Sequence, residues 1–303
     1  MIGIVILNYR TWKETVECVD SIRKSTNCEY KIYLVDNNSP DDSYTQLHAK
    51  YHSSKDIVLM QAQYNNGYSA GNNLGIKRAL SDGMEVILLS NSDVIYYSNS
   101  IDLMYTYLIN NKHVGILGPK VVLPNNNIQS SPRMNYTFKN YILGKKPFLY
   151  FDFKGIMQET YFKNYKYDTE LVFDGFVAGC CIALSKEYFE KCGLLDENVF
   201  LYFEESIISH KALMKGLKTC VLPQAVVLHK CSVSIGKQIS AFSRLHRYYS
   251  SMYMLRRYKG INKIQLSFIL FLNLIPFISN GIIKREYRKF GKVFIQKSLE
   301  LFE

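Results

Sequence analysis

The sequence lacks the cysteine patterns of disulfide-stabilised and zinc-binding proteins. It has seven cysteines, an odd number, and no two of them have a C-x-x-C spacing. An odd set that includes the adjacent pair Cys180 and Cys181 does not suit a disulfide framework, and structural zinc sites generally need closely spaced ligand pairs. We therefore expect free, mostly buried thiols.

The sequence shows no secretory signal, internal repeat or low-complexity tract. A secretory signal needs a basic start, an apolar core and small residues at the cleavage site, but here the apolar run Ile2–Leu7 comes first. We therefore expect a cytoplasmic protein. With 303 residues, 48% of them hydrophobic, the chain can bury a large core, as one α/β domain or as a domain with an appendage.

Acidic residues are scarce at the C-terminal end. From Arg244 to Glu303, 12 Lys or Arg stand against 3 Asp or Glu, so this segment carries nine of the 11 net positive charges. Its apolar run Ile264–Ile283 has basic residues on both sides, which suits an anionic membrane surface better than nucleic acid. Because the run contains Pro276 and Gly281, an interfacial helical hairpin is favoured over a spanning helix.

Strand and helix patterns alternate over residues 1–95. Apolar runs predict buried parallel strands at Ile2–Leu7, Ile32–Val35, Ile57–Met60 and Val86–Leu89. Helical spacing predicts crossover helices at Trp12–Ser25, with Thr11 and Glu14 as a capping box, and at Asn72–Ser81, ended by Gly83. This alternation predicts a doubly wound nucleotide-binding half.

The remaining sequence indicates a second half and a tail. Pro119–Asp174 has weak periodicity and is predicted to be an irregular connection or lid that helps to shape a substrate cleft. Further elements are predicted at Phe176–Leu184 (strand), from a Ser185 cap to Cys192 (helix), at Ile207–Lys215 (helix) and at Thr219–Leu228 (strand). We expect one domain over 1–236, with halves 1–95 and 96–236, and a basic, amphipathic helical extension over 237–303.

Polar residues follow the predicted strands at the edge where open α/β sheets bind ligands. They are Asn8 and Tyr9 after the first strand, Asp36 and Asn38 after the second, and Asn91, Ser92 and Asp93 after the fourth. The Asp36 carboxylate can accept a hydrogen bond from a pyrimidine N3–H or a ribose hydroxyl. A turn-forming role before Asn37 and Pro40 is the alternative.

A glycine-rich segment precedes the fourth strand. Gly67, Gly71 and Gly75 permit close backbone approach, and Asn72 and Asn73 lie at the predicted helix start, where free N–H groups suit a phosphate or a base edge. The spacing is not G-x-G-x-x-G, and a turn with an Asn N-cap explains part of the pattern.

The order of these motifs resembles the inverting family 2 glycosyltransferases of GT-A fold, particularly the rhamnosyltransferase-like branch. The resemblance spans Ile2 to Gly236. Its motifs are IVILNYR at 4–10, LVDNNS at 34–39, NNGYSAGNNLGI at 65–76, LLSNSDV at 88–94, FVAGCCIALSKEYFEKCGLLDENVFLYFEES at 176–206 and VVLHKCSVSIG at 226–236. It implies a mixed, mostly parallel sheet flanked by helices.

The resemblance also implies a donor and metal site. Asn91-Ser92-Asp93 stands at the family's D-x-D, with one carboxylate, and His229 matches the late histidine that contacts the metal or diphosphate. Asp93 and His229 are therefore the expected ligands of Mg²⁺ or Mn²⁺, a hard cation that neutralises the leaving nucleoside diphosphate. Without the resemblance, a lone histidine is more often structural.

Glu204 and Glu205 stand where the family usually has Glu-Asp. The resemblance implies a general base that takes the acceptor hydroxyl's proton, and we assign Glu205 to this role, with Glu204 as the alternative. The sequence departs from the family pattern at Glu205, at Ile207, where a further Asp is usual, and at Lys211, where Arg is usual. An acidic first turn of a helix is the competing structural interpretation.

We therefore expect a metal-dependent inverting transferase on the inner face of the plasma membrane. It would move a sugar, preferably rhamnose from dTDP-rhamnose, to a lipid-linked glycan in bacterial surface polysaccharide synthesis. We expect no nucleic acid partner, and a homodimer is possible. Another donor, such as a UDP-hexose, and a non-catalytic partner of a polysaccharide assembly complex are the alternatives. A nucleotidyltransferase ranks lower, because residues 8–14 lack its glycine-rich loop.

Overall fold

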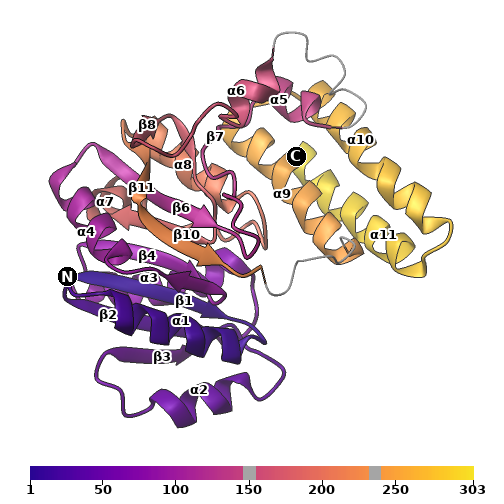
Figure 1. Ribbon diagram of the computed structural model, residues 1–303. Coiled ribbons are helices and arrows are strands. Elements are labelled where there is room, and N and C mark those ends of the chain that lie inside the picture. The colour runs from indigo at the N-terminus through magenta and orange to yellow at the C-terminus, as the bar shows by residue number, and fades with distance from the viewer. Residues whose placement is uncertain (146–154, 232–239) are drawn as a thin grey trace.

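The computed structural model of the chain describes residues 1–145, 155–231 and 240–303 (Figure 1). The last predicted motif, 226–236, lies partly outside these residues, and so does the predicted boundary at 236/237.

A mixed sheet forms the centre of the larger unit, in the order β3-β2-β1-β4-β10-β6-β11-β5, with β8 paired to β11. The strands are β1 (Ile2–Asn8), β2 (Tyr30–Asp36), β3 (Ile57–Gln61), β4 (Val86–Asn91), β5 (Val94–Tyr96), β6 (Val114–Val122), β8 (Leu171–Phe173), β10 (Cys181–Ser185) and β11 (Lys218–His229). Neighbouring strands are parallel in the series β3-β2-β1-β4 and between β6 and β11. The other pairs in this sheet are antiparallel. The predicted α/β class and the four N-terminal strands are confirmed.

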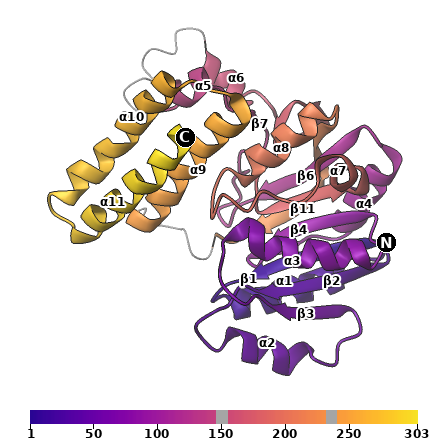
Figure 2. The same cartoon turned by 180° about the vertical axis from the view of Figure 1, so that it is seen from behind.

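Helices cover both faces of this sheet (Figures 1 and 2). One face packs against α1 (Trp12–Ser25), α2 (Ser43–Tyr51) and α4 (Ser100–Asn110), and the other against α3 (Tyr68–Ser81), α7 (Lys186–Cys192) and α8 (Glu204–Met214). The near-continuous apolar strands fit this arrangement, because a strand between two helical layers has no solvent-facing side.

Several predicted details are wrong, among them the start of α8, which is at Glu204 and not at Ile207. Helix α1 has the predicted bounds, but the Thr11 side chain does not cap it and instead bonds to Ser92 and Asn8. Helix α3 starts at Tyr68, four residues before the predicted start. The predicted strand Phe176–Leu184 is divided, because β9 (Gly175–Phe176) pairs with β7 (Arg133–Met134) in a separate two-stranded sheet and only β10 joins the main sheet.

The connection from 119 to 174 is partly regular where the structure describes it. It includes the end of β6, then β7, α5 (Phe138–Leu143), α6 (Ile156–Thr160) and β8. Thr137 caps α5 through a capping box with Asn140. Of these, α5 and α6 lie beside the C-terminal helices, whereas β8 joins the main sheet next to β11 (Figure 1).

The C-terminal helices form a second unit beside the sheet (Figures 1 and 2). They are α9 (Ala241–Lys259), α10 (Lys263–Gly281) and α11 (Arg285–Leu299), followed by a short 3-10 turn at Glu300–Phe302. They share an apolar core that includes Met252, Leu266, Phe277 and Phe294 and also takes in Tyr141 and Ile207. The extension is helical as expected, but the run Ile264–Ile283 does not fold as a hairpin of its own: it forms the single helix α10, which continues through Pro276 and packs against α11.

Candidate active site

The predicted donor residues gather at one edge of the sheet. Asn8 is paired with Asp36 across β1 and β2, and Leu7 with Asn91 across β1 and β4. Asn8 Nδ2 donates to Asp36 Oδ1 at 2.7 Å, and Asn8 Oδ1 accepts from Thr11 Oγ1 at 3.3 Å. Thr11 Oγ1 lies 2.8 Å from Ser92 Oγ, so hydrogen bonds connect Asp36 to the β4–β5 turn that carries Asp93.

Asp36 is itself closed off from solvent. Its exposed fraction is 0%, and besides Asn8 it accepts hydrogen bonds from the backbone N–H of Ser39 at 2.9 Å and from Ser39 Oγ at 2.7 Å. These hydrogen bonds stabilise the turn after β2, as expected for the turn-forming role that is the alternative to nucleotide binding. The solvent-facing groups here are Tyr9 and Asn38, so contact between Asp36 and a nucleotide stays a prediction.

Asp93 and His229 meet at the end of the sheet. Residues 94 and 229 are paired across β5 and β11, and His229 Nε2 lies 3.4 Å from Asp93 Oδ1. The other ring nitrogen, Nδ1, lies 2.9 Å from Gln129 Oε1. When Nδ1 donates its proton to that amide oxygen, Nε2 turns a lone pair towards the carboxylate, as in histidines that bind metals.

This pair fits a divalent cation whose coordination is completed by substrate and water. An imidazole nitrogen and a carboxylate oxygen face the same space, but no group of three or more His, Cys, Asp or Glu suited to a metal occurs in the described residues. Mg²⁺ is commonly bound by one or two carboxylates together with substrate phosphates, and here the imidazole of His229 would be a further ligand beside the single carboxylate. Asp93 and His229 would hold the ion, and the ion would offset the charge of a leaving diphosphate.

The glycine-rich segment serves packing in this structure. Because α3 starts at Tyr68, Asn72 and Asn73 lie inside the helix, and the predicted placement at its start is wrong. A Cβ at Gly71 would come within 2.6 Å of Leu7 Cδ1, and one at Gly67 within 2.3 Å of Phe200 O, so these glycines admit protein neighbours. Asn72 is fully buried, and its side-chain amide forms a hydrogen bond with Tyr68 O. Binding of the nucleotide sugar by Gly67, Gly71 and Asn72 stays a prediction.

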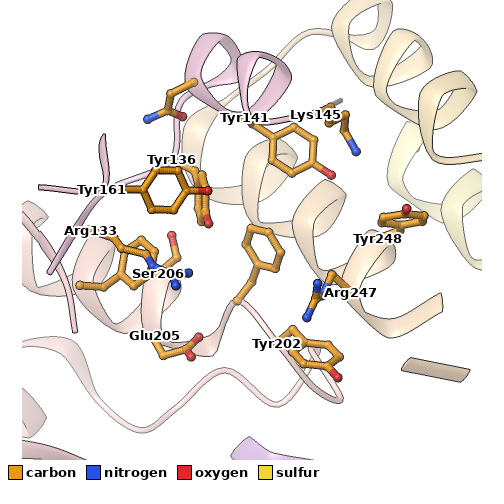
Figure 3. A pocket seen from close by; sticks show the side chains of 14 residues that line it. Arg133, Tyr136, Tyr141, Lys145, Tyr161, Tyr202, Glu205, Ser206, Arg247 and Tyr248 are labelled. Atoms are coloured by element: carbon orange, nitrogen blue, oxygen red, sulfur yellow. The ribbon is translucent and has the colours of Figure 1, made fainter. Parts of the chain in front are cut away.

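Glu205 lines a cavity of about 420 Å³ between the sheet domain and the C-terminal helices (Figure 3). Tyr202 and Phe203, just before α8, both have positive φ, at 70° and 68°, which is uncommon for bulky residues and turns the chain into the helix. A Cβ at Gly179 would lie 2.4 Å from Glu205 Oε1, so a larger residue there would displace this carboxylate from its position. The fold thus positions Glu205 specifically.

The cavity also lies next to the Asp93 turn. Gly179 borders Glu205, and the following residue, Cys180, accepts a 2.9 Å backbone hydrogen bond from Asn91. One dipeptide therefore separates the Glu205 carboxylate from the turn that carries Asp93. The cavity and the Asp93–His229 pair therefore lie on either side of Gly179–Cys180.

Burial raises the pKa of Glu205, and the positive charges of Arg133 and Arg247 oppose this rise. Glu204 differs, because it points into the protein between α3 and α8, where its Oε2 has no hydrogen-bond partner. Burial, followed by repulsion from Glu205, raises the pKa of Glu204 well above its ordinary value. Of the two carboxylates, only Glu205 lines the cavity.

We expect Glu204→Gln to stabilise the fold at alkaline pH. A carboxyl whose pKa is raised in the native state favours folding below its unfolded pKa and loses this contribution as pH rises through the native pKa. At pH 8 the glutamine variant should be more stable by about 1 kcal/mol or more, because its amide is neutral, whereas wild type must bury a charge or keep a proton that the unfolded chain has lost. Urea unfolding at pH 5 and pH 8 measures the difference, and a variant that loses more stability at pH 8 than at pH 5 would contradict it.

Sequence reasoning missed the basic side chains of the cavity. Arg133, Lys145 and Arg247 line it together with several tyrosines, but they come from β7, the end of α5 and α9. No sequence spacing connects positions so far apart. The only available signal was the richness in Asn, Tyr, Phe and Lys of the segment from 119 to 174.

Comparison with known proteins gives a consistent result. The model of "Glycosyl transferase family 2" matches residues 3–193. The chain is 25% identical to a low-salt glycan biosynthesis hexosyltransferase of Haloferax volcanii, over 71% of this chain and 62% of that protein, so it spans less than two thirds of that relative. It is 21% identical to the N-acetylglucosaminyl-diphospho-decaprenol L-rhamnosyltransferase of Mycobacterium tuberculosis, over 86% of each chain.

A solved structure supports the same fold. The GalNAc-T7 structure with UDP, GalNAc and Mn²⁺ aligns with a TM-score of 0.63 at 18% identity, over 86% of this chain and 49% of that one. The mixed sheet, its two helical layers and this likeness identify the GT-A fold. Since the family model covers most of the sheet domain, the chain belongs to glycosyltransferase family 2.

Proposed function

We propose that this protein is a metal-dependent, inverting glycosyltransferase in which Glu205 is the general base. The observation that carries the proposal is the placement of two acidic groups on either side of Gly179–Cys180: Asp93 beside His229, and Glu205 in the cavity. A nucleoside-diphosphate sugar at the strand edge would bring its diphosphate to Asp93. An acceptor in the cavity would bring its hydroxyl to Glu205.

The proposed reaction is a single displacement. Glu205 takes the proton of the acceptor hydroxyl as its oxygen bonds to the anomeric carbon, and the bond between that carbon and the diphosphate oxygen breaks. The nucleoside diphosphate leaves with the bonding electrons. Attack opposite the leaving group inverts the anomeric configuration.

For the substrates, we propose rhamnose from dTDP-rhamnose and a lipid-linked glycan. This choice is supported by the similarity to the mycobacterial rhamnosyltransferase, whose name specifies a diphospho-decaprenol acceptor. Another donor, such as a UDP-hexose, stays an alternative because the Haloferax relative is named a hexosyltransferase. Thermal shift with a panel of nucleotide sugars and Mn²⁺ tests the donor, since a ligand of the native state raises the melting temperature.

That panel also tests the proposal itself. A folded protein that neither binds dTDP- or UDP-sugars nor hydrolyses or transfers them with Mg²⁺ or Mn²⁺ would rule out the transferase function. The non-catalytic alternative would leave biological function intact in the variants Asp93→Ala and Glu205→Gln. A homodimer remains a prediction, which analytical ultracentrifugation measures directly.

We further propose that α10 binds the inner face of the plasma membrane. Among the described residues, α10 alone is long and apolar enough to cross a membrane. One of its faces is buried in the helical unit, whereas a stripe along the other is exposed: Ile264, Phe268, Phe271, Ile275 and Ile278, followed by Ile282 just after the helix. An exposed apolar stripe near basic residues is typical of interfacial helices.

Replacing Ile278 with glutamate should weaken binding to vesicles. Ile278 is 66% exposed, and burying such a side chain in the acyl region contributes about 1.5–3 kcal/mol. We therefore expect a loss of at least about tenfold in affinity for phosphatidylglycerol-containing vesicles, measured by co-sedimentation. Met214→Glu, at a 69% exposed position on α8, is the control and should bind as wild type. Equal binding of all three proteins would contradict membrane contact by α10.

A further inference from the structure

Three basic side chains face the cavity that Glu205 lines. Arg133, Lys145 and Arg247 line the cavity, and none of them forms an ion pair with a carboxylate among the described residues (Figure 3). Basic side chains at protein surfaces are common, but three converging on one cavity are unusual. Their charge is available to a ligand.

Aromatic rings and an amide hold these cations in place. The Arg133 guanidinium carbon lies 5.4 Å from the Tyr161 ring, and that of Arg247 lies 4.9 Å from the Tyr202 ring. Lys145 Nζ lies 4.6 Å from the Tyr141 ring and 5.0 Å from the Tyr248 ring, and donates to Asn273 Oδ1 at 2.6 Å. Ring and amide contacts orient a cation but do not neutralise it.

The charges indicate a doubly negative ligand. With Glu205 ionised, the three cations and the single carboxylate leave the cavity with two net positive charges. A diphosphate diester carries two negative charges, and guanidinium groups match phosphate oxygens bidentately. A single carboxylate, as in an acidic sugar, would balance only half of this charge.

An apolar groove lies beside the cavity. It has a volume of about 510 Å³ between α10 and α11 and is lined mainly by apolar side chains, including Leu274, Phe277, Ile278 and Ile295. The ring of Phe277 contacts that of Tyr248, with centroids 6.1 Å apart, and Tyr248 lines the cavity. One pair of aromatic rings therefore forms a wall between the charged cavity and the apolar groove.

We propose that Arg133, Lys145 and Arg247 bind the diphosphate of an amphiphilic acceptor whose hydrocarbon chain occupies the α10–α11 groove. The inference rests on the proposed transferase function and assigns residues to its acceptor. The diphosphate lies against the cations, the first sugar extends towards Glu205, and the chain leaves past Tyr248 and Phe277 towards the membrane-facing side of α10.

Binding of farnesyl diphosphate, a soluble probe with both features, tests this assignment. We expect wild type to bind it in EDTA, as measured by calorimetry. Arg133→Gln, Lys145→Gln and Arg247→Gln should each weaken binding about ten- to a hundredfold, since each removes one charge-assisted contact. Arg257→Gln, at an exposed position on the same helix as Arg247, should bind as wild type. Arg247→Lys should recover part of the affinity.

Further probes separate the two parts of the acceptor. Ile295→Glu in the groove should weaken farnesyl diphosphate binding but not inorganic diphosphate binding. No binding of farnesyl diphosphate by wild type, or binding unchanged in all three cation variants, would overturn the proposal. Competition by glucuronate as strong as by inorganic diphosphate would overturn the phosphate assignment in favour of an acidic sugar.

Donor binding is measured in parallel to keep this test independent of the proposed function. Wild type and the cation variants should all bind a nucleoside diphosphate with Mn²⁺, because the Asp93 and His229 pair is outside the cavity lining. Donor binding without cation-dependent probe binding would reject the acceptor assignment alone. Absence of donor binding and turnover in wild type would reject the transferase function.

Discussion

Replacing Glu205 with glutamine lowers kcat by about 10²- to 10⁴-fold, the range typical of a lost general base. The amide keeps the size of the side chain and its position against Gly179, so it still fits the cavity. Because the base acts on the acceptor, nucleotide-sugar binding should change little. Steady-state transfer assays combined with calorimetric donor titration measure both quantities.

The pH dependence of kcat/KM provides a second test of Glu205 as the general base. Burial raises the pKa of Glu205, so the carboxylate becomes protonated, and unable to accept a proton, at a higher pH than an exposed glutamate would. Wild-type kcat/KM should therefore fall as pH decreases through this raised pKa. Glu190→Gln, an exposed substitution on α7, should leave the profile unchanged. Near-wild-type kcat in Glu205→Gln would exclude Glu205 as the base.

Removing the Asp93 carboxylate should impair both metal binding and turnover. Asp93→Ala leaves His229 as the single protein ligand of the proposed pair, and stabilisation of a leaving diphosphate by a metal is worth several kcal/mol. We expect kcat/KM to fall about 10³-fold or more. Unlike Glu205→Gln, this variant should also lose the Mn²⁺-dependent gain in nucleotide affinity.

Titration of UDP or dTDP with and without Mn²⁺ separates these two effects. Glu29→Ala, at an exposed carboxylate that precedes β2 and therefore lies at the opposite end of the parallel strands from Asp93, is the control and should retain the metal effect. An Asp93→Ala protein that remains folded and keeps Mn²⁺-dependent binding would show that the ion, if used, is held elsewhere.

The N-terminal strands were predictable because they are buried on both faces. Two of the predicted strands, Ile2–Leu7 and Ile57–Met60, start where the observed strands start and end one residue before them. The start of α3 was not predictable in the same way. Gly71 and Gly75 weaken the helical pattern, yet they are needed because side chains there would collide with β1 at Leu7 and Val5. Tertiary packing thus overrides local propensity at this helix.

The candidate site was partly predictable for a topological reason. Residues directly after adjacent parallel strands meet at one edge, so the proximity of Asn8, Asp36 and the Asp93 turn follows from strand order. That Asp36 is sealed by Ser39 depends on a turn conformation that sequence spacing does not determine. The basic groups of the cavity were not predictable, because α9 contributes Arg247 through packing between two units.

The contact between α9 and the sheet domain makes the C-terminal tail part of the cavity. Tyr253 and Tyr258 both donate to Asp196 Oδ2, in the loop that leads to α8, so the tail is bonded to the loop that precedes Glu205. A truncated protein without the tail would lose one wall of the acceptor cavity and these anchors, while its nucleotide edge kept all of its own hydrogen bonds. Exchange of the tail would therefore change the lining of the cavity and leave the strand edge at Asp36 and Asp93 as it is.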